Sequence, residues 1–164
     1  MELETLFGLP AHPLMVHMPV VLIPLAGVIA IVFAFRSQWL DRFGWGLVAL
    51  SGVAALGSIL AAGSGEGLED TARNKPGFGD HAEMGEAARN LGLVFFLVVL
   101  GVVLVRQVAR KKGAETGVLK FAASKAGAAL LAGALVLSAV AATATITIAG
   151  HQGAKLVWEQ KSGG

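Results

Sequence analysis

Four long apolar segments alternate with shorter polar segments along the chain. They cover about residues 13–35, 43–62, 87–105 and 126–149. A helix that crosses a bilayer needs ~20 consecutive, mostly apolar residues. Each segment therefore predicts one membrane-spanning helix. We expect an all-α protein in which residues 1–164 form a single domain, an integral membrane four-helix bundle with up-down-up-down topology.

The second apolar segment is unusually rich in small residues. It contains Gly46, Gly52, Gly57 and Ala61. Small residues at helical spacing let two membrane helices approach closely. This pattern predicts that the second helix packs tightly against its neighbours.

Composition agrees with a membrane protein and narrows the available chemistry. The sequence is 55% hydrophobic and 15% charged, whereas an ordinary soluble domain carries roughly a quarter charged residues. It contains no cysteine, so the chain itself cannot provide a thiolate metal site or ligands for an iron–sulfur cluster. It also carries no glycine-rich phosphate loop, nucleophile triad or paired-carboxylate signature. Enzyme activity stays uncertain, and an electron-transfer or accessory subunit is favoured over a stand-alone enzyme.

Charged residues are divided unequally between the two sides of the expected bundle. The polar segments after the first and third spans hold eight basic and two acidic residues, and the remaining polar segments hold five basic and nine acidic ones. Basic loops stay in the cytoplasm. We therefore expect a multi-pass protein of the bacterial inner membrane with both termini in the periplasm. The net charge of +2 then reflects this orientation in the lipid bilayer and predicts no nucleic-acid partner.

The histidines provide the main functional signal. His12 and His17 lie at the start of the first span, His81 precedes the third, and His151 follows the fourth. The chain has four histidines in total, and the expected topology brings all of them to the periplasmic side. Polar residues at membrane depth are costly and tend to mark function. This pattern predicts a periplasmic histidine cluster that binds a cofactor.

Haem is the cofactor that this pattern favours. Histidine imidazole is a common axial ligand of haem iron, and four-helix bundles hold cofactors between facing helices. His12 and His17 are five residues apart, which places them ~140° apart on an ideal helix, so they do not readily bind one ion together. We expect one or two b-type haems, with His17 as one axial ligand and His81 or His151 as the other. The remaining histidines would hold haem propionates, ligate a second haem or accept protons from a quinol.

A site for a small metal ion is the alternative. His12, His17, His81 and His151, with Glu83 nearby, have the donor chemistry of a zinc or copper site, and methionines would soften it toward Cu(I). The methionines near these positions are Met15, Met18 and Met84. Methionine also packs well in apolar helices, and we interpret these three as core residues. A related hypothesis is a non-enzymatic subunit that only scaffolds a larger respiratory or photosynthetic complex.

Three segments resemble a known bacterial membrane family, domain of unknown function 2231. The opening HPLMVHMPVVLIPLAG is similar to its His-Pro-x-x-Val-His-Phe-Pro signature. DHAEMGEAARNLGLVFF and AGHQGAKLVWE resemble its third-helix histidine element and its closing Gly-His-x-Gly-x-x-Leu-Val-Tyr element. Met18 replaces the usual phenylalanine and Trp158 the usual tyrosine, which removes a phenolic hydroxyl. Some relatives join this unit to Rieske or cytochrome c modules, so the resemblance implies membrane electron transfer.

Together these observations predict a membrane-bound, b-type haem-binding electron-transfer subunit. Its expected partners are a periplasmic redox protein or quinone, a larger membrane complex or further copies of the same chain. Because no histidine is expected on the cytoplasmic side, electron transfer within the outer half of the membrane is favoured over transfer across it.

Overall fold

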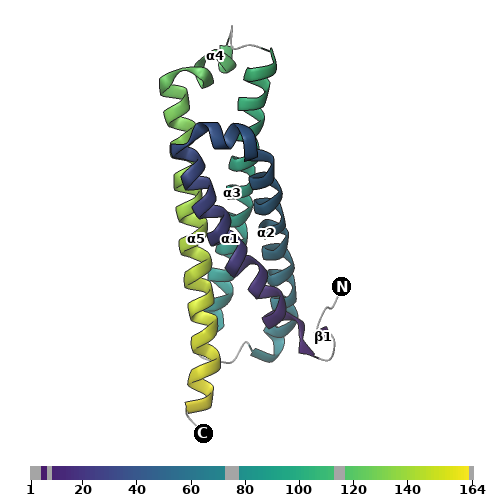
Figure 1. The fold of residues 1–164 in the computed structure, drawn as a ribbon. Coiled ribbons are helices and arrows are strands. Elements are labelled where there is room, and N and C mark those ends of the chain that lie inside the picture. The colour runs from purple at the N-terminus through teal and green to yellow at the C-terminus, as the bar shows by residue number, and fades with distance from the viewer. Residues whose placement is uncertain (1–4, 7–8, 73–77, 113–116, 163–164) are drawn as a thin grey trace.

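The chain folds into a bundle of four long helices that run side by side in alternating directions (Figure 1). The computed structural model describes residues 5–6, 9–72, 78–112 and 117–162. The helices are α1 (Ala11–Phe35), α2 (Ser37–Ala72), α3 (Phe78–Lys112), α4 (Gly117–Ala123) and α5 (Lys125–Ser162). Two short strands, β1 (Thr5–Leu6) and β2 (Leu9–Pro10), pair antiparallel just before α1. The predicted all-α, up-down-up-down architecture is confirmed, with the short α4 between α3 and α5 as an addition.

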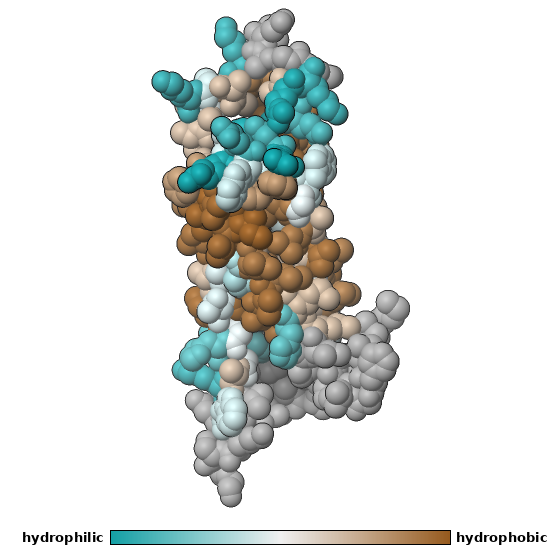
Figure 2. Space-filling model, viewed as in Figure 1, coloured by the Kyte–Doolittle hydropathy of each residue, from teal (hydrophilic) through white to brown (hydrophobic). Residues whose placement is uncertain are grey.

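Four of these helices are long and apolar enough to cross a membrane. The candidate spans are Met15–Phe35, Ser37–Gly65, His81–Lys111 and Lys125–Lys155. Figure 2 shows an apolar belt around the middle of the bundle, with polar residues toward both ends. Many apolar side chains of the long helices are exposed to the surroundings, for example Leu137 by 73%, as expected for contact with lipid. The protein is therefore a multi-pass membrane protein, and the single-domain organisation stays a prediction.

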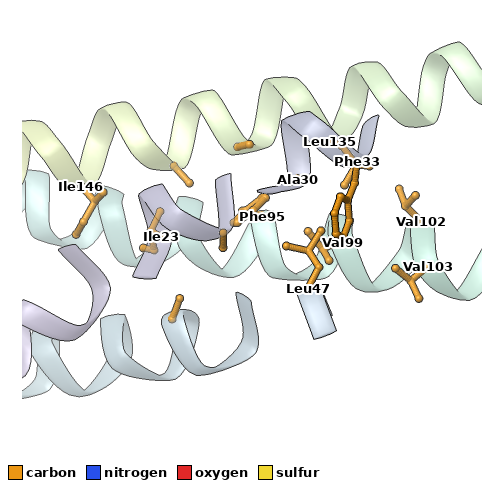
Figure 3. Close-up of a cluster of buried hydrophobic side chains, with 14 of the residues drawn as sticks. Ile23, Ala30, Phe33, Leu47, Phe95, Val99, Val102, Val103, Leu135 and Ile146 are labelled. Carbon is orange, nitrogen blue, oxygen red and sulfur yellow. The ribbon is translucent and has the colours of Figure 1, made fainter. Parts of the chain in front are cut away.

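The core lies along the bundle axis and receives side chains from all four long helices (Figure 3). Phe95 and Val99 of α3, Ile23 of α1 and Leu135 of α5 are almost completely buried. Between α1 and α5 the buried residues are mostly alanines, among them Ala30. Without a hydrophobic effect inside lipid, close van der Waals packing holds membrane helices together, and small residues make it possible.

Serines provide the buried polar side chains of α2. Ser51, Ser58 and Ser64 are all less than 9% exposed. Each hydroxyl donates a hydrogen bond to a backbone carbonyl of the preceding turn, with oxygen–oxygen distances of 2.8 to 3.1 Å. Such back-bonding satisfies the hydroxyl within its own helix. This row of serines therefore needs no ligand to explain it.

The helices extend further than the predicted spans. α2 continues beyond the predicted span at residue 62, through a glycine-rich segment, to Ala72, and Ser64 is buried against the bundle and bonded to the Ala61 carbonyl. α3 likewise continues beyond the predicted span at residue 105, through basic residues, to Lys112. The buried position of Ser64 offsets the low helix propensity of glycine in α2, whereas the Arg, Lys and Gln residues at the end of α3 are themselves good helix formers.

One residue, Arg36, separates α1 from α2. Its N–H donates to the Val32 carbonyl at 3.0 Å, and its own carbonyl accepts from the Trp39 N–H at 2.8 Å. The rings of Phe33 and Trp39 meet edge to face with centroids 6.2 Å apart. Hydrogen bonds and an aromatic contact thus fix this turn on both sides.

Candidate functional site

The histidine-bearing segments meet at one end of the bundle. The start of α1, the start of α3 and the end of α5 all lie at the end opposite the one that carries α4 (Figure 1). We call this the histidine end; it comprises residues 11–20, 78–85 and 148–155. His17, His81 and His151 therefore share one end of the molecule, as the sequence predicted from topology. His12 is in the first turn of α1, and its side chain lies outside the described part of the structure.

His81 is partly buried, with its ring against α5. A methyl group at Gly153 would stand 2.8 Å from Cε1 of His81 and 3.4 Å from each ring nitrogen. The Cε1 edge of the imidazole therefore points at the backbone of α5. Its Nδ1 atom is buried. Only glycine at position 153 leaves room for the ring in this place.

His17 and His151 are exposed on the outside of the bundle. A contact between Val20 of α1 and Gly150 of α5 shows which residues of the two helices lie at the same height. Cγ2 of Val20 would stand 3.8 Å from a methyl group at Gly150. At ~1.5 Å per residue, His17 lies about 4.5 Å and His151 about 1.5 Å from that level, both toward the histidine end. The two histidines thus lie at nearly the same height.

The same helical geometry gives the side on which each histidine lies. At ~100° per residue, His17 is turned about 60° around α1 from Val20, and His151 about 100° around α5 from Gly150. On both helices this rotation points away from the core. Ile23 on α1 and Gly153 on α5 face the core, and they are rotated from the contact between Val20 and Gly150 in the opposite direction. His17 and His151 therefore flank the outer side of one helix pair. We call this surface the α1–α5 seam.

His81 is separated from His151 by the body of α5. His151 and Gly153 are two residues apart and point about 160° away from each other, and Gly153 is the residue that contacts His81. The structure thus brings His17 and His151 to one surface and places His81 on another. Among the described residues, no three His, Asp or Glu side chains are grouped so that they could hold a metal ion.

The methionines near the histidine end pack against helices. Met18 contacts α2, where a methyl group at Gly57 would stand 2.8 Å from its sulfur. Met84 is half-buried and packs against the hydrophobic core. Glu83 is exposed. Met84 therefore packs against the core as expected, whereas Met18 is 43% exposed and lies at the bundle surface rather than in the core.

Gly153 and Gln152 were not singled out from the sequence. Gln152 is half-buried, and its Oε1 atom is buried without a hydrogen-bond partner in the described part of the chain. The pair of glycines that brackets His151 and Gln152 was the available signal, because both glycines let another helix approach α5. Gly150 faces α1 and Gly153 faces α3.

The comparison with protein families agrees with these histidine elements. The family described as "Predicted membrane protein (DUF2231)" matches residues 8–163, which include all four histidines. The chain belongs to the DUF2231 family. The resemblance of its three histidine-containing segments to DUF2231 is thereby confirmed. No significant match was found among curated proteins or among solved structures.

Proposed function

We propose that this DUF2231 protein is an electron-transfer subunit that binds haem b at the α1–α5 seam, with His17 and His151 as axial ligands. The observation that supports this pair is their position: two exposed imidazoles from different helices flank one seam at nearly the same height. Haem iron needs only one or two protein ligands, whereas a zinc site takes three or four. The described residues offer a pair of histidines and no group of three metal ligands.

The surface beside this pair suits a haem. Along the α1–α5 seam, the exposed side chains deeper in the membrane include Val21 and Val28 on α1 and Val140 on α5. Thr147 is also exposed there, and its hydroxyl donates to the Thr143 carbonyl at 2.8 Å. An apolar surface matches the face of a porphyrin. Lys155 is exposed one turn beyond His151, where its ammonium group would pair with a propionate. When bound, the iron would supply a reversible one-electron couple.

His81 has a different role in this proposal. Its ring is packed against Gly153 with Nδ1 buried, on the side of α5 away from His151. We assign it to holding α3 against α5 beneath the haem site. Removing its ring leaves both proposed ligands in place.

An optical spectrum of the full chain, purified in detergent and recorded oxidised and then reduced, tests the proposal. We expect a Soret band and a reduced α band, present as isolated or after addition of hemin. His17→Ala and His151→Ala should each remove or strongly shift these bands. His81→Ala is the matched control and should keep them, because it deletes an imidazole at the same end but outside the seam.

Two results would contradict this assignment. A wild-type protein with no Soret band and no hemin uptake would exclude haem. Loss of the bands in His81→Ala but not in His151→Ala would exclude this ligand pair. Elemental analysis of the same samples covers the alternative, since stoichiometric copper or zinc that disappears in His17→Ala would indicate a small-ion site.

The position of the site also defines the proposed partners. The histidines lie at one end of the bundle, and the charge distribution favours the periplasm of the bacterial inner membrane for this end. We therefore propose electron exchange with a periplasmic redox protein and with the quinone pool or a larger membrane complex. Rapid-mixing experiments with a reduced quinol analogue test this, and a haem that quinol does not reduce would contradict the quinone part.

A further inference from the structure

A second candidate site lies at the other end of the bundle, in a cleft between the start of α2 and the end of α3. Its volume is about 340 Å³. The polar and aromatic residues that line it are Asp41, Trp45, Arg106, Gln107, Arg110 and Lys111. Figure 2 shows polar residues gathered at this end, above the apolar belt. The cleft therefore lies where a bilayer passes from hydrocarbon to headgroups.

The cleft carries an excess of positive charge. Three basic side chains line it against one carboxylate, Asp41. Asp41 accepts two hydrogen bonds from Arg106, at 2.8 Å from Nε and 3.0 Å from Nη2. Arg110 approaches the same carboxylate only to 3.7 Å and is 63% exposed. Asp41 thus neutralises the charge of Arg106 and orients its side chain. The positive charges of Arg110 and Lys111 remain to attract an anion.

On its membrane side, the cleft is continuous with the apolar surface of the bundle. Leu40 and Val103, which complete its lining, are almost fully buried. About one helical turn deeper than Trp45 and Gln107 lie Ala49 on α2 and Leu104 on α3, both exposed. A small anion would use only the charges of this cleft. A molecule with a charged head and apolar chains would use the charges and this apolar track together.

We propose that the cleft binds the phosphate diester of an anionic glycerophospholipid, with the acyl chains along α2 and α3. Arg110 and Lys111 donate to the phosphate oxygens. Arg106, held by Asp41, presents its remaining N–H groups to the same ligand, because one guanidinium carries five donors. Basic pockets between membrane helices at the cytoplasmic headgroup level are suited to such lipids. This inference does not depend on haem binding at the opposite end.

Lipid binding to the full chain, measured by native mass spectrometry in a neutral detergent, tests the proposal. The probes are phosphatidylglycerol, phosphatidylcholine and inorganic phosphate. We expect phosphatidylglycerol to bind more tightly than phosphatidylcholine. The double variant R110Q/K111Q should weaken phosphatidylglycerol binding about 30-fold, on the basis of about fivefold for each basic residue near the membrane surface.

The matched control is K120Q/K125Q, which removes two exposed lysines at the same end of the bundle but outside the cleft. Its affinity should stay within about twofold of the wild type. Equal weakening in both double variants would overturn the proposal in favour of a general surface potential. Equal binding of phosphatidylcholine, or complete displacement of phosphatidylglycerol by inorganic phosphate, would also overturn it. Helical circular dichroism verifies that each variant is folded.

Discussion

Glycine contacts determine how closely the helices approach at several points. A methyl group would stand 2.8 Å from Met18 if placed at Gly57, from His81 if placed at Gly153, and from Thr143 Oγ1 if placed at Gly27. A real Cβ does not come this close to another heavy atom, so a larger residue forces a neighbour to move. The consequence depends on that neighbour, since a side-chain tip moves more easily than a buried ring.

Gly57→Ala should destabilise the protein, and Gly46→Ala should not. The new methyl group at position 57 would meet Met18 and also stand 3.3 Å from Cδ of Pro19, a rigid and fully buried ring. We expect a loss of about 1–3 kcal/mol in the free energy of unfolding, the usual cost of overpacking. Position 46 has nothing within 4 Å. Unfolding in a denaturing detergent measures the stability of both variants. Equal stability of the two would contradict the conclusion that α2 packs closely at Gly57 but not at Gly46.

The sequence predicted close packing of α2 but not which of its small residues make contact. Gly57 meets α1 and Gly52 meets Phe96 of α3, while Gly46 meets nothing within 4 Å. A membrane helix is apolar on every face, so hydrophobic periodicity does not reveal which face is buried. Only the packing of the neighbouring helices distinguishes these glycines.

At the scale of elements, a charged pair joins α2 to α3 near the α4 end. Arg106 donates two hydrogen bonds to Asp41, and both side chains are 23% exposed. Two parallel bonds between a guanidinium and a carboxylate are stronger and better defined than a single contact. The pair therefore fixes the relative position of the start of α2 and the end of α3.

Asp41→Asn should lower the free energy of unfolding by about 1 kcal/mol, within the range for a partly buried charged hydrogen bond. Arg106→Gln should have a similar effect. The double variant should lose less free energy of unfolding than the two single variants added together. The control is Glu86→Gln, which breaks the Arg89 pair on α3, where Glu86 is 65% exposed. That change should cost only a few tenths of a kcal/mol. Additive losses for Asp41 and Arg106 would show that the two side chains are not coupled.

The number and direction of the long helices could be predicted from the sequence, whereas their ends could not. Bilayer thickness sets the length of an apolar segment, so four segments gave four helices. The ends depend on contacts outside the bilayer core. Ser64 lies buried on the part of α2 beyond the predicted span, and Arg106, which contacts Asp41, lies on the part of α3 beyond the predicted span.

At the scale of the whole molecule, the bundle has two chemically different ends. The end with α4 carries the basic cleft, and the opposite end carries the histidines. The chain contains no cysteine, so single cysteines can be introduced as topology markers without further changes. This makes the predicted orientation in the membrane directly testable.

Lys155→Cys should react with a membrane-impermeant maleimide in intact cells, and Lys120→Cys should react only after the membrane is opened. Both side chains are exposed, and they lie at opposite ends of the bundle. The expectation follows from the excess of basic residues at the α4 end, because basic segments favour the cytoplasmic side of the membrane. The reverse pattern of labelling would place the histidine end in the cytoplasm and contradict periplasmic termini.

The location of the candidate site was only partly predictable from the sequence. Topology alone predicted that the histidines share one end. It did not predict that His17 and His151 flank an outer seam while His81, partly buried, packs against Gly153. Those positions follow from the rotation of each helix about its axis, which is set by small-residue contacts such as Gly150 with Val20.

The single-residue turn at Arg36 has a mechanical consequence. Its hydrogen bonds and the contact between Phe33 and Trp39 restrict movement at the junction of α1 and α2. Any tilting of α1 relative to α2 must then pivot at this fixed joint, and displacement grows with distance along the helix. The largest excursion falls at the far tip of α1, so a small flexing of the joint would widen or narrow the gap that separates His17 from α5.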